Sequence, residues 1–330
     1  MPEISRTGRV IDIRCESASE FLDVLDPING QFAQRAGIEY VFRGVTSSDY
    51  PLLPSAFRDD SELLLSGVYH RGPLPNLLHQ CTAELHTIRR FFDIAAQHGV
   101  TVPEDSARLR FQLDEWDTLL TFHPKAILDA NWPPVEFYSL IALAQHYGIP
   151  TRALDWTSSS FVAAYFAARP TISKSDDIAV WVFSAVVEKL DRILSPKTYA
   201  RSVQLFTVSG ADNDNLRAQR GLFMIQTQSL NASPEAFQPL TYDKAYLSNL
   251  AVVGASAWLY KVAAPSSEAP IIRAALGRAG VTAAALFPGL WGVAREFHEQ
   301  RDLAIAQLMD VRRSASQELE RRIRELERGA

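Results

Sequence analysis

One arginine stands at the end of a predicted strand, in the run IEYVFRGV at residues 38–45. Its apolar neighbours predict that the Arg43 guanidinium is half-buried, and a buried cation without a partner is costly. Arg43 therefore needs either an internal partner such as Asp155 or the phosphate or carboxylate of a ligand. Gly44 allows close approach of a ligand or a positive φ. Arg58, in PSAFR, poses the same two alternatives.

A second polar group lies within LAQHYGIPTRALDWT, residues 143–157, in a frame of Leu, Ile, Pro and Trp. Polar side chains placed in this way either satisfy one another or face a cleft. The Thr157 hydroxyl or Ser158–Ser160 could cap the following helix, and an exposed helix N-terminus is an anion site. Both interpretations stay open. The candidates in this group are Gln145, His146, Thr151, Arg152, Asp155, Trp156 and Thr157.

A third group lies in RAQRGLF, residues 217–223. Gln219 precedes a predicted strand, and Gly221 lets the backbone bend at its start. The Gln219 amide could hydrogen-bond a ribose hydroxyl, and Phe223 could pack against the ligand. The alternative is a polar entry into the strand.

Familiar catalytic and metal-binding motifs are missing. The chain has no GxGxxG, GxxxxGK[ST], HExxH or GxSxG, and its seven histidines do not cluster at ligand spacing with carboxylates. We therefore predict no metal site. Cys15 and Cys81 are far apart and form no CxxC, so we predict two free thiols in a reducing compartment.

The composition is that of a globular chain: 330 residues, 47% hydrophobic and 22% charged. A formal net charge of −5 argues against nonspecific binding to nucleic acid or to an anionic membrane. The start, MPEISRTGRV, has no apolar core of the signal-peptide type, and the longest apolar run, near 178–187, is too short to span a bilayer. These features predict a soluble, cytoplasmic protein.

Periodicity and turn residues predict one α+β domain with a helical insertion at about 60–140 and a long C-terminal helix. Residues 46–58, rich in Ser and Pro, should be a loop. Predicted strands are 10–13, 38–45, 178–185, 221–227 and 257–263. Predicted helices begin near Glu20 after Ser17 or Ser19, and cover 76–98, 104–121, 135–146, 159–168, 269–280 and 294–328.

The C-terminal helix carries a narrow apolar seam at steps of three or four residues. This seam either docks on the parent domain or mediates self-association through a helix pair. Its members are Leu308, Val311, Ala315, Leu319, Ile323 and Leu326.

Together these segments resemble the FRG domain family, named for its Phe-Arg-Gly motif. The resemblance runs from about residue 18 to 295 and implies an FRG domain at 1–295 with a C-terminal helix at 296–330. It departs from the family pattern at Ala153, where Leu is usual. The family is associated with bacterial and phage proteins, including toxin and defence modules. The matching segments are YVFRGV (40–45), LLPSAFR (52–58), LAQHYGIPTRALDWTSSSFVAAYFA (143–167), RAQRGLFMI (217–225) and LFPGLWGVA (286–294).

At fold level the chain also resembles ADP-ribosyltransferases, which implies a split sheet and NAD as the cofactor. That fold has an Arg on an early strand, a Ser/Thr-rich strand end before a VA-x-x-F helix, and a strand bearing a Glu. The resemblance implies that Arg43 clamps the pyrophosphate or ribose, Thr157 supports the strand end, Gln219 orients the ribose, and His146 or Asp155 is the acid/base group or electrostatic stabiliser. Residues implied to line the cofactor site are Arg43, Gly44, Arg58, Gln145, Thr151, Arg152, Trp156 and Phe223.

Gln219 stands where that fold carries its catalytic Glu. A unit charge at about 4 Å with an effective dielectric constant near 20 contributes roughly 4 kcal/mol, or about a thousandfold in rate. Either Asp155 supplies the missing charge, or the site binds NAD or a nucleotide without fast transfer. The hypotheses are therefore an NAD-using transferase or hydrolase with a protein or nucleic-acid acceptor, a non-catalytic nucleotide sensor, and a protein–protein module in phage–host conflict that acts through the C-terminal helix.

Overall fold

A computed structural model of the chain describes residues 2–7, 10–34, 39–170, 176–185, 203–209, 213–231, 241–244, 259–305 and 308. Within them the strands are β1 (Glu3–Thr7), β2 (Val10–Arg14), β3 (Tyr40–Val45), β4 (Glu62–Leu65), β5 (Val68–Arg71), β6 (Asn131–Trp132), β7 (Ala153–Thr157), β8 (Asp177–Ser184), β9 (Val203–Phe206), β10 (Gly221–Gln226), β11 (Gln228–Ser229) and β12 (Leu259–Pro265). The α-helices are α1 (Ala18–Val24), α2 (Leu77–Gln97), α3 (Ala107–Phe122), α4 (Tyr138–His146), α5 (Ser160–Ala167), α7 (Asp214–Ala218), α9 (Ala269–Arg278) and α10 (Ala283–Leu286). Short 3-10 helices are η1 (Ser55–Phe57), η2 (Pro124–Ile127), η3 (Val135–Phe137) and η6 (Ser266–Glu268), and residues 290–305 form a further helix.

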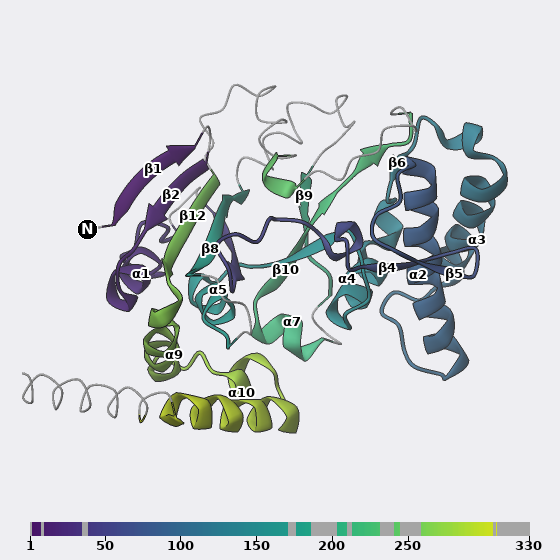
Figure 1. Ribbon diagram of the computed structural model, residues 1–330. Coiled ribbons are helices and arrows are strands. Elements are labelled where there is room, and N and C mark those ends of the chain that lie inside the picture. The colour runs from purple at the N-terminus through teal and green to yellow at the C-terminus, as the bar shows by residue number, and fades with distance from the viewer. Residues whose placement is uncertain are drawn as a thin grey trace, which may run out of the picture.

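An eight-stranded mixed sheet organises the molecule, in the order β1-β2-β12-β8-β3-β7-β10-β9 (Figure 1). β12 runs parallel to β2, and the other neighbouring pairs are antiparallel. The α+β class predicted from the sequence is confirmed.

The sheet is nearly interrupted between its fifth and sixth strands. β3 pairs with β8 along its whole length, whereas β3 and β7 share the single residue pair Phe42–Thr157. β7 pairs instead with β10 over five positions, from Ala153 to Thr157. Beyond the shared pair the two strands separate, which opens a notch in the sheet.

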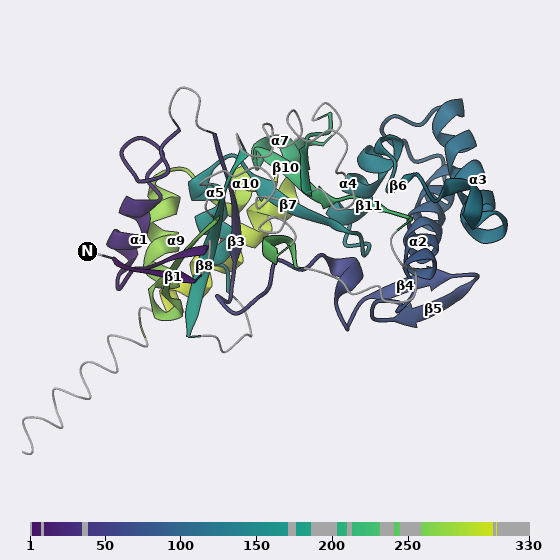
Figure 2. The ribbon, with the colours of Figure 1, turned by 90° about the horizontal axis from the view of Figure 1, so that it is seen from above.

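Each half of the sheet has its own layer of helices. α1, α5 and α9 pack with β2, β3, β8 and β12 around one apolar core that includes Phe21, Phe42, Val180 and Ile272. α2, α3 and α4 pack against β7 and β10 in another core. In both ribbon views the insertion with α2, α3 and the β4–β5 hairpin lies at the end of the molecule opposite β1 and α1 (Figure 1, Figure 2). The β3–β7 notch therefore lies where the two halves meet.

Capping side chains begin several of these helices at the positions that the sequence indicates. Ser17 accepts a hydrogen bond from the Glu20 amide at α1, and Ser159 accepts one from Val162 at α5. Asn76 caps α2, the longest helix of the insertion. These caps explain why the predicted starts of the helices lie within a few residues of the observed ones.

Several strands were not among those predicted from the sequence. Residues 153–157 lead into the helix α5 as expected, and they also form the central strand β7, because they pair with both β3 and β10. The predicted helical insertion also contains the antiparallel hairpin β4–β5. Of the seam predicted on the C-terminal helix, residues 309–330 lie outside the described part of the chain, so docking and self-association stay predictions. Among the described residues, no helix is both long enough and apolar enough to cross a membrane.

Candidate functional site

A cleft of about 960 Å³ lies at the notch between β3 and β7. Its wall draws on β3, the loop that follows it, the end of α4, β7, α5, the end of α7, and the segment after α10. Four stretches that are distant in sequence therefore contribute to one hollow. Of the residues predicted from the sequence, it is lined by Arg43, Gly44, Arg58, Gln145, His146, Asp155, Trp156, Thr157 and Gln219.

Arg43 lies where the two strands separate. Its Nη1 donates to the backbone oxygen of Asp155 and lies 3.8 Å from the carboxylate atom Oδ2 of the same residue. The Arg43 side chain is 17% exposed, against 55% for Asp155. Burial lowers the pKa of Arg43, and Asp155 opposes this shift while Arg58 adds to it. Arg43 thus has the internal partner Asp155 and also lines a cleft, and its role toward a ligand stays a prediction.

The carboxylate of Asp155 is held by a chain of hydrogen bonds from α4. Gln145 Nε2 donates to Asp155 Oδ2 at 3.1 Å. Gln145 Oε1 accepts from Thr151 Oγ1 at 2.7 Å and from Ser55 Oγ at 3.2 Å. The two donors determine the orientation of the Gln145 amide, so its NH₂ group faces Asp155. Gln145 thereby positions the carboxylate beside Arg43.

His146 lies on the same wall at the end of α4. Burial lowers its pKa below the usual range, with Asp155 acting in the opposite direction, so the imidazole is neutral near pH 7. The Nδ2 group of Asn215 lies 3.3 Å from His146 Nε2, which fits a ring that accepts at Nε2. A neutral ring that accepts at Nε2 carries its hydrogen on Nδ1.

Thr157 and Gln219 join β7 to the end of α7. Thr157 Oγ1 donates to the Gln219 backbone oxygen at 2.7 Å and accepts from the Ser159 amide at 3.0 Å. Its hydroxyl is thus used within the protein, as expected of a residue that supports the strand end. The Gln219 side chain donates from Nε2 to the Leu286 carbonyl at 3.1 Å, and no described residue donates to its Oε1. Gln219 therefore offers an acceptor toward the cleft.

Sequence reasoning missed part of the wall. Arg169 follows the end of α5, and Arg295 lies on the helix 290–305; both line the cleft together with Phe166 and Phe287. The two arginines are distant in sequence. Each follows one of the segments that resemble the FRG family: Arg169 comes two residues after 143–167, and Arg295 comes directly after LFPGLWGVA (286–294), which contains Phe287.

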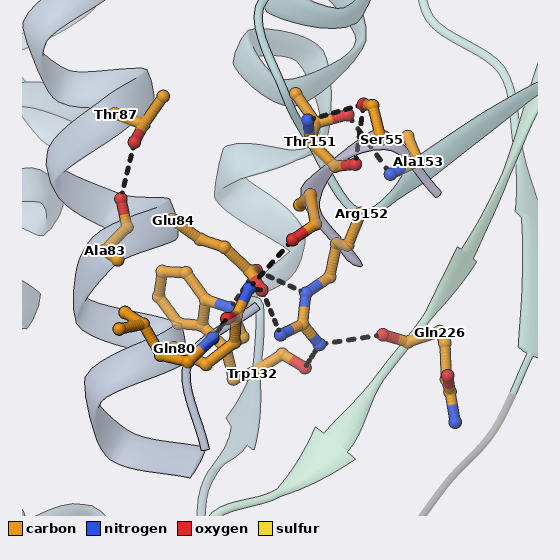
Figure 3. A network of polar contacts seen from close by, with 12 residues as sticks. Ser55, Gln80, Ala83, Glu84, Thr87, Trp132, Thr151, Arg152, Ala153 and Gln226 are labelled. Carbon is orange, nitrogen blue, oxygen red and sulfur yellow. Dashed lines mark hydrogen bonds and ion pairs between the residues drawn. The ribbon is translucent and has the colours of Figure 1, made fainter. Parts of the chain in front are cut away.

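Arg152 was predicted to bind the cofactor, and the structure does not bring it to the cleft. It is buried in an ion pair with Glu84 of α2, with Nε–Oε2 and Nη2–Oε1 distances of 2.5 and 2.9 Å (Figure 3). Nη1 donates to the carbonyls of Gln226 and Trp132. Because its guanidinium is fully occupied and its side chain is 1% exposed, we do not retain Arg152 as a ligand-binding residue.

Two further predicted ligand-binding residues also lie outside the cleft wall. Phe223 is 2% exposed and stacks on Phe206 in the apolar core, with ring centroids 5.4 Å apart. Thr151 is 2% exposed and reaches the site only through its hydrogen bond to Gln145. Both residues therefore act within the protein: Phe223 packs in the core, and Thr151 orients Gln145.

Gly44 has a different role from the predicted one. It lines the cleft, but its φ is not positive. A Cβ added there would lie 1.9 Å from the Ala163 carbonyl oxygen of α5, so the missing side chain makes room for a helix. Trp156 also lines the cleft, although its side chain is 3% exposed and packs near Phe183.

A second hollow, of about 990 Å³, lies between the β4–β5 hairpin, α2 and the turn after α4. Most of its lining is apolar, and it includes none of the residues predicted to act on a ligand. Cys15 and Cys81 are buried free thiols, as predicted, and burial raises the pKa of Cys15 to about 12. In the part of the chain that the structure describes, no three His, Cys, Asp or Glu side chains are grouped to hold a metal ion.

A comparison with protein-family models supports the resemblance that the motif residues indicated. The family model of the FRG domain matches residues 38–176. This chain contains an FRG domain. No curated protein and no solved structure matches the chain. The FRG match includes Arg43, Gln145, His146, Asp155 and Thr157, whereas the predicted limits of 1–295 for the domain stay a prediction.

Residues outside the matched segment complete the cleft of the FRG domain. Gln219 lies beyond its C-terminal limit, as do Phe287 and Arg295. The FRG motif residues thus form one part of the wall, and later segments of the chain form the rest.

Proposed function

We propose that the FRG domain cleft binds NAD⁺ and that the protein transfers or hydrolyses its ADP-ribose group, in the toxin or phage-defence setting that the family resemblance implies. The observation that carries this proposal is the convergence of Arg43, Asp155, His146 and Gln219 on one cleft. Its volume of about 960 Å³ lies within the range of small-molecule and cofactor sites.

The residues present fit a dinucleotide. Arg43 and Arg58 supply guanidinium groups suited to a pyrophosphate, and their mutual repulsion is relieved when an anion lies between them. Gln219 Oε1, which accepts from no described residue, suits a ribose hydroxyl. NAD⁺, when bound, supplies a glycosidic bond whose cleavage releases nicotinamide.

The chain's own groups would act on that bond through charge and position. The Asp155 carboxylate, held by Gln145, stabilises positive charge that develops on the ribose. Arg43 offsets part of this effect because it lies 3.8 Å from the same carboxylate. The neutral imidazole of His146, whose Nε2 accepts from Asn215, carries its hydrogen on Nδ1 and can donate it toward a ligand. We therefore expect slow turnover, because the Arg43 guanidinium offsets part of the charge of the Asp155 carboxylate.

A second candidate function is a non-catalytic nucleotide sensor. It is favoured by one contact: the Gln219 amide donates to the Leu286 carbonyl. An ionised carboxylate at this position cannot donate, so this part of the cleft is built around an amide. The sensor hypothesis predicts ligand-induced thermal stabilisation without nicotinamide release.

An Arg43→Gln variant tests the proposed binding site. We expect its affinity for NAD⁺ to fall by about 10- to 100-fold, because a charge-assisted hydrogen bond contributes about 1.5–3 kcal/mol. Calorimetric titration with NAD⁺ measures binding, and chromatography of released nicotinamide measures turnover. Arg71→Gln, on the exposed end of β5, is the matched control and should change neither. Undiminished binding and turnover in Arg43→Gln would refute the role given to Arg43.

A Gln219→Glu variant separates the two candidate functions. We expect the change to destabilise the fold by about 1–3 kcal/mol, because the donor to Leu286 is lost and two oxygens face each other. Turnover should not increase. Thermal unfolding and nicotinamide release are measured together, with exposed Gln97→Glu on α2 as the control for the added charge. A gain of tenfold or more in turnover at unchanged stability would instead indicate a decayed enzyme.

A further inference from the structure

The far wall of the cleft carries a second group of positive charges, separate from Arg43 and Arg58. Arg169 follows α5, and Arg295 lies on the helix 290–305. Arg295 lies beyond residue 176, so the segment that matches the FRG domain contains only Arg169 of this pair. Its chemistry is therefore not explained by the FRG motif.

One carboxylate, Glu299, neutralises only part of this positive charge. Arg295 Nε donates to Glu299 at 3.1 Å, and the same carboxylate also accepts from Tyr165. No carboxylate of the described residues forms an ion pair with Arg169. Burial lowers the pKa of Arg169, and the nearby Arg295 lowers it further. Behind them, the Nε and Nη1 atoms of Arg273 are buried without a hydrogen-bond partner. Arg169, Arg273 and Arg295 thus lie near Glu299, with Asp302 also near Arg273. The guanidiniums outnumber the carboxylates, which favours an added anion.

Aromatic rings lie beside both guanidiniums. Arg169 lies 5.8 Å from the ring of Phe166, and Arg295 lies 4.7 Å from the ring of Phe287. Phe166 and Phe287 contact each other edge to face at 6.1 Å and both line the cleft. Aromatic rings next to arginines are suited to a nucleobase whose ribose carries a phosphate.

We propose that Arg169 and Arg295 form a second anion subsite that takes a phosphomonoester on the adenosine part of the ligand. This inference rests on the proposed function, since it takes the pyrophosphate to lie at Arg43 and Arg58. It assigns the substrate class as a phosphorylated dinucleotide, for which NADP⁺ is the probe, in preference to NAD⁺. A pyrophosphate at Arg43 and Arg58 leaves Arg169 without an ion-pair partner among the described residues.

Calorimetric titration of the full chain with NAD⁺ and with NADP⁺ tests the subsite, because the two probes differ by one 2′-phosphate. We expect the wild type to bind NADP⁺ at least tenfold more tightly. Arg169→Gln and Arg295→Gln should each reduce this preference to less than threefold. Arg301→Gln, on the same helix and paired with Asp302 at the surface, is the matched control and should retain the full preference.

The outcomes separate the two proposals. Equal affinity of the wild type for both probes would overturn the second subsite alone, and a preference that survives both substitutions would overturn its assignment to these arginines. Binding of neither probe would instead contradict the proposed function. Thermal unfolding checks that each variant is folded. Arg169→Gln is the safer variant, because Arg295→Gln also removes the contact with Glu299.

Discussion

Replacing Arg152 by methionine is expected to lower the free energy of unfolding by about 3–5 kcal/mol, because it leaves the Glu84 carboxylate buried without its counter-charge. Glu84 is 5% exposed, so water cannot replace the guanidinium. Trp132 Nε1 and Gln80 Nε2 still donate to it, but neither carries a charge. Denaturant unfolding followed by circular dichroism measures the change.

Two further variants identify the physical cause. Arg217→Met removes an exposed ion pair with Asp214, whose partners are 66% and 63% exposed, and should cost no more than about 1 kcal/mol. Combining Arg152→Met with Glu84→Leu should recover much of the lost stability, because the uncompensated charge is then gone. A loss below about 1 kcal/mol for Arg152→Met alone would show that the ion pair does not hold the insertion to the sheet.

A Gly44→Ala substitution is the second change expected to have a large effect. The added Cβ would lie 1.9 Å from the Ala163 oxygen and 2.6 Å from the Ala167 nitrogen. Both are backbone atoms of α5, so the helix must move as a unit. We expect a loss of about 3 kcal/mol in the free energy of unfolding, at the upper end of the usual cost of overpacking.

The same substitution should weaken ligand binding, because α5 carries Phe166 and leads to Arg169 on the cleft wall. Gly277→Ala in α9 is the matched control: no atom within 4 Å meets its added Cβ. It should raise stability by about 0.5–1 kcal/mol through helix propensity. Thermal unfolding of both variants measures the contrast, and a Gly44→Ala protein as stable as the wild type would contradict the proposed role of Gly44.

The β3–β7 notch explains why an arginine in a central strand lines a cleft. A central strand normally has neighbours on both sides that satisfy its backbone. β3 and β7 share one residue pair only, so Arg43 lies next to the backbone oxygen of Asp155 where the ladder ends. Positions farther along either strand face the cleft instead of each other. The access of Arg43 to the cleft thus depends on the interruption of the sheet between β3 and β7.

Several elements could be predicted from local pattern alone. Ser17, Asn76 and Ser159 precede apolar periodic runs, and each caps a helix. β8 and β10 are short runs rich in apolar residues, and such runs become buried strands. The strand at 153–157 was harder to predict, because its five residues follow a proline-containing turn and precede a helix. Its pairing with β3 and β10 decides that the segment is a strand.

For the site, the sequence by itself determined which chemical groups are available: the Arg of the FRG motif, the Gln-His pair, Asp155, and an amide at position 219. Only the tertiary structure decided which of them meet. Arg43 and Arg152 both lie among apolar residues, yet one faces a cleft and the other is neutralised by Glu84. Arg169 lies near the end of the FRG match and Arg295 lies outside it, and they become neighbours because the helix 290–305 packs beside α5. The partner of a charged side chain is set by long-range packing, and local sequence does not encode it.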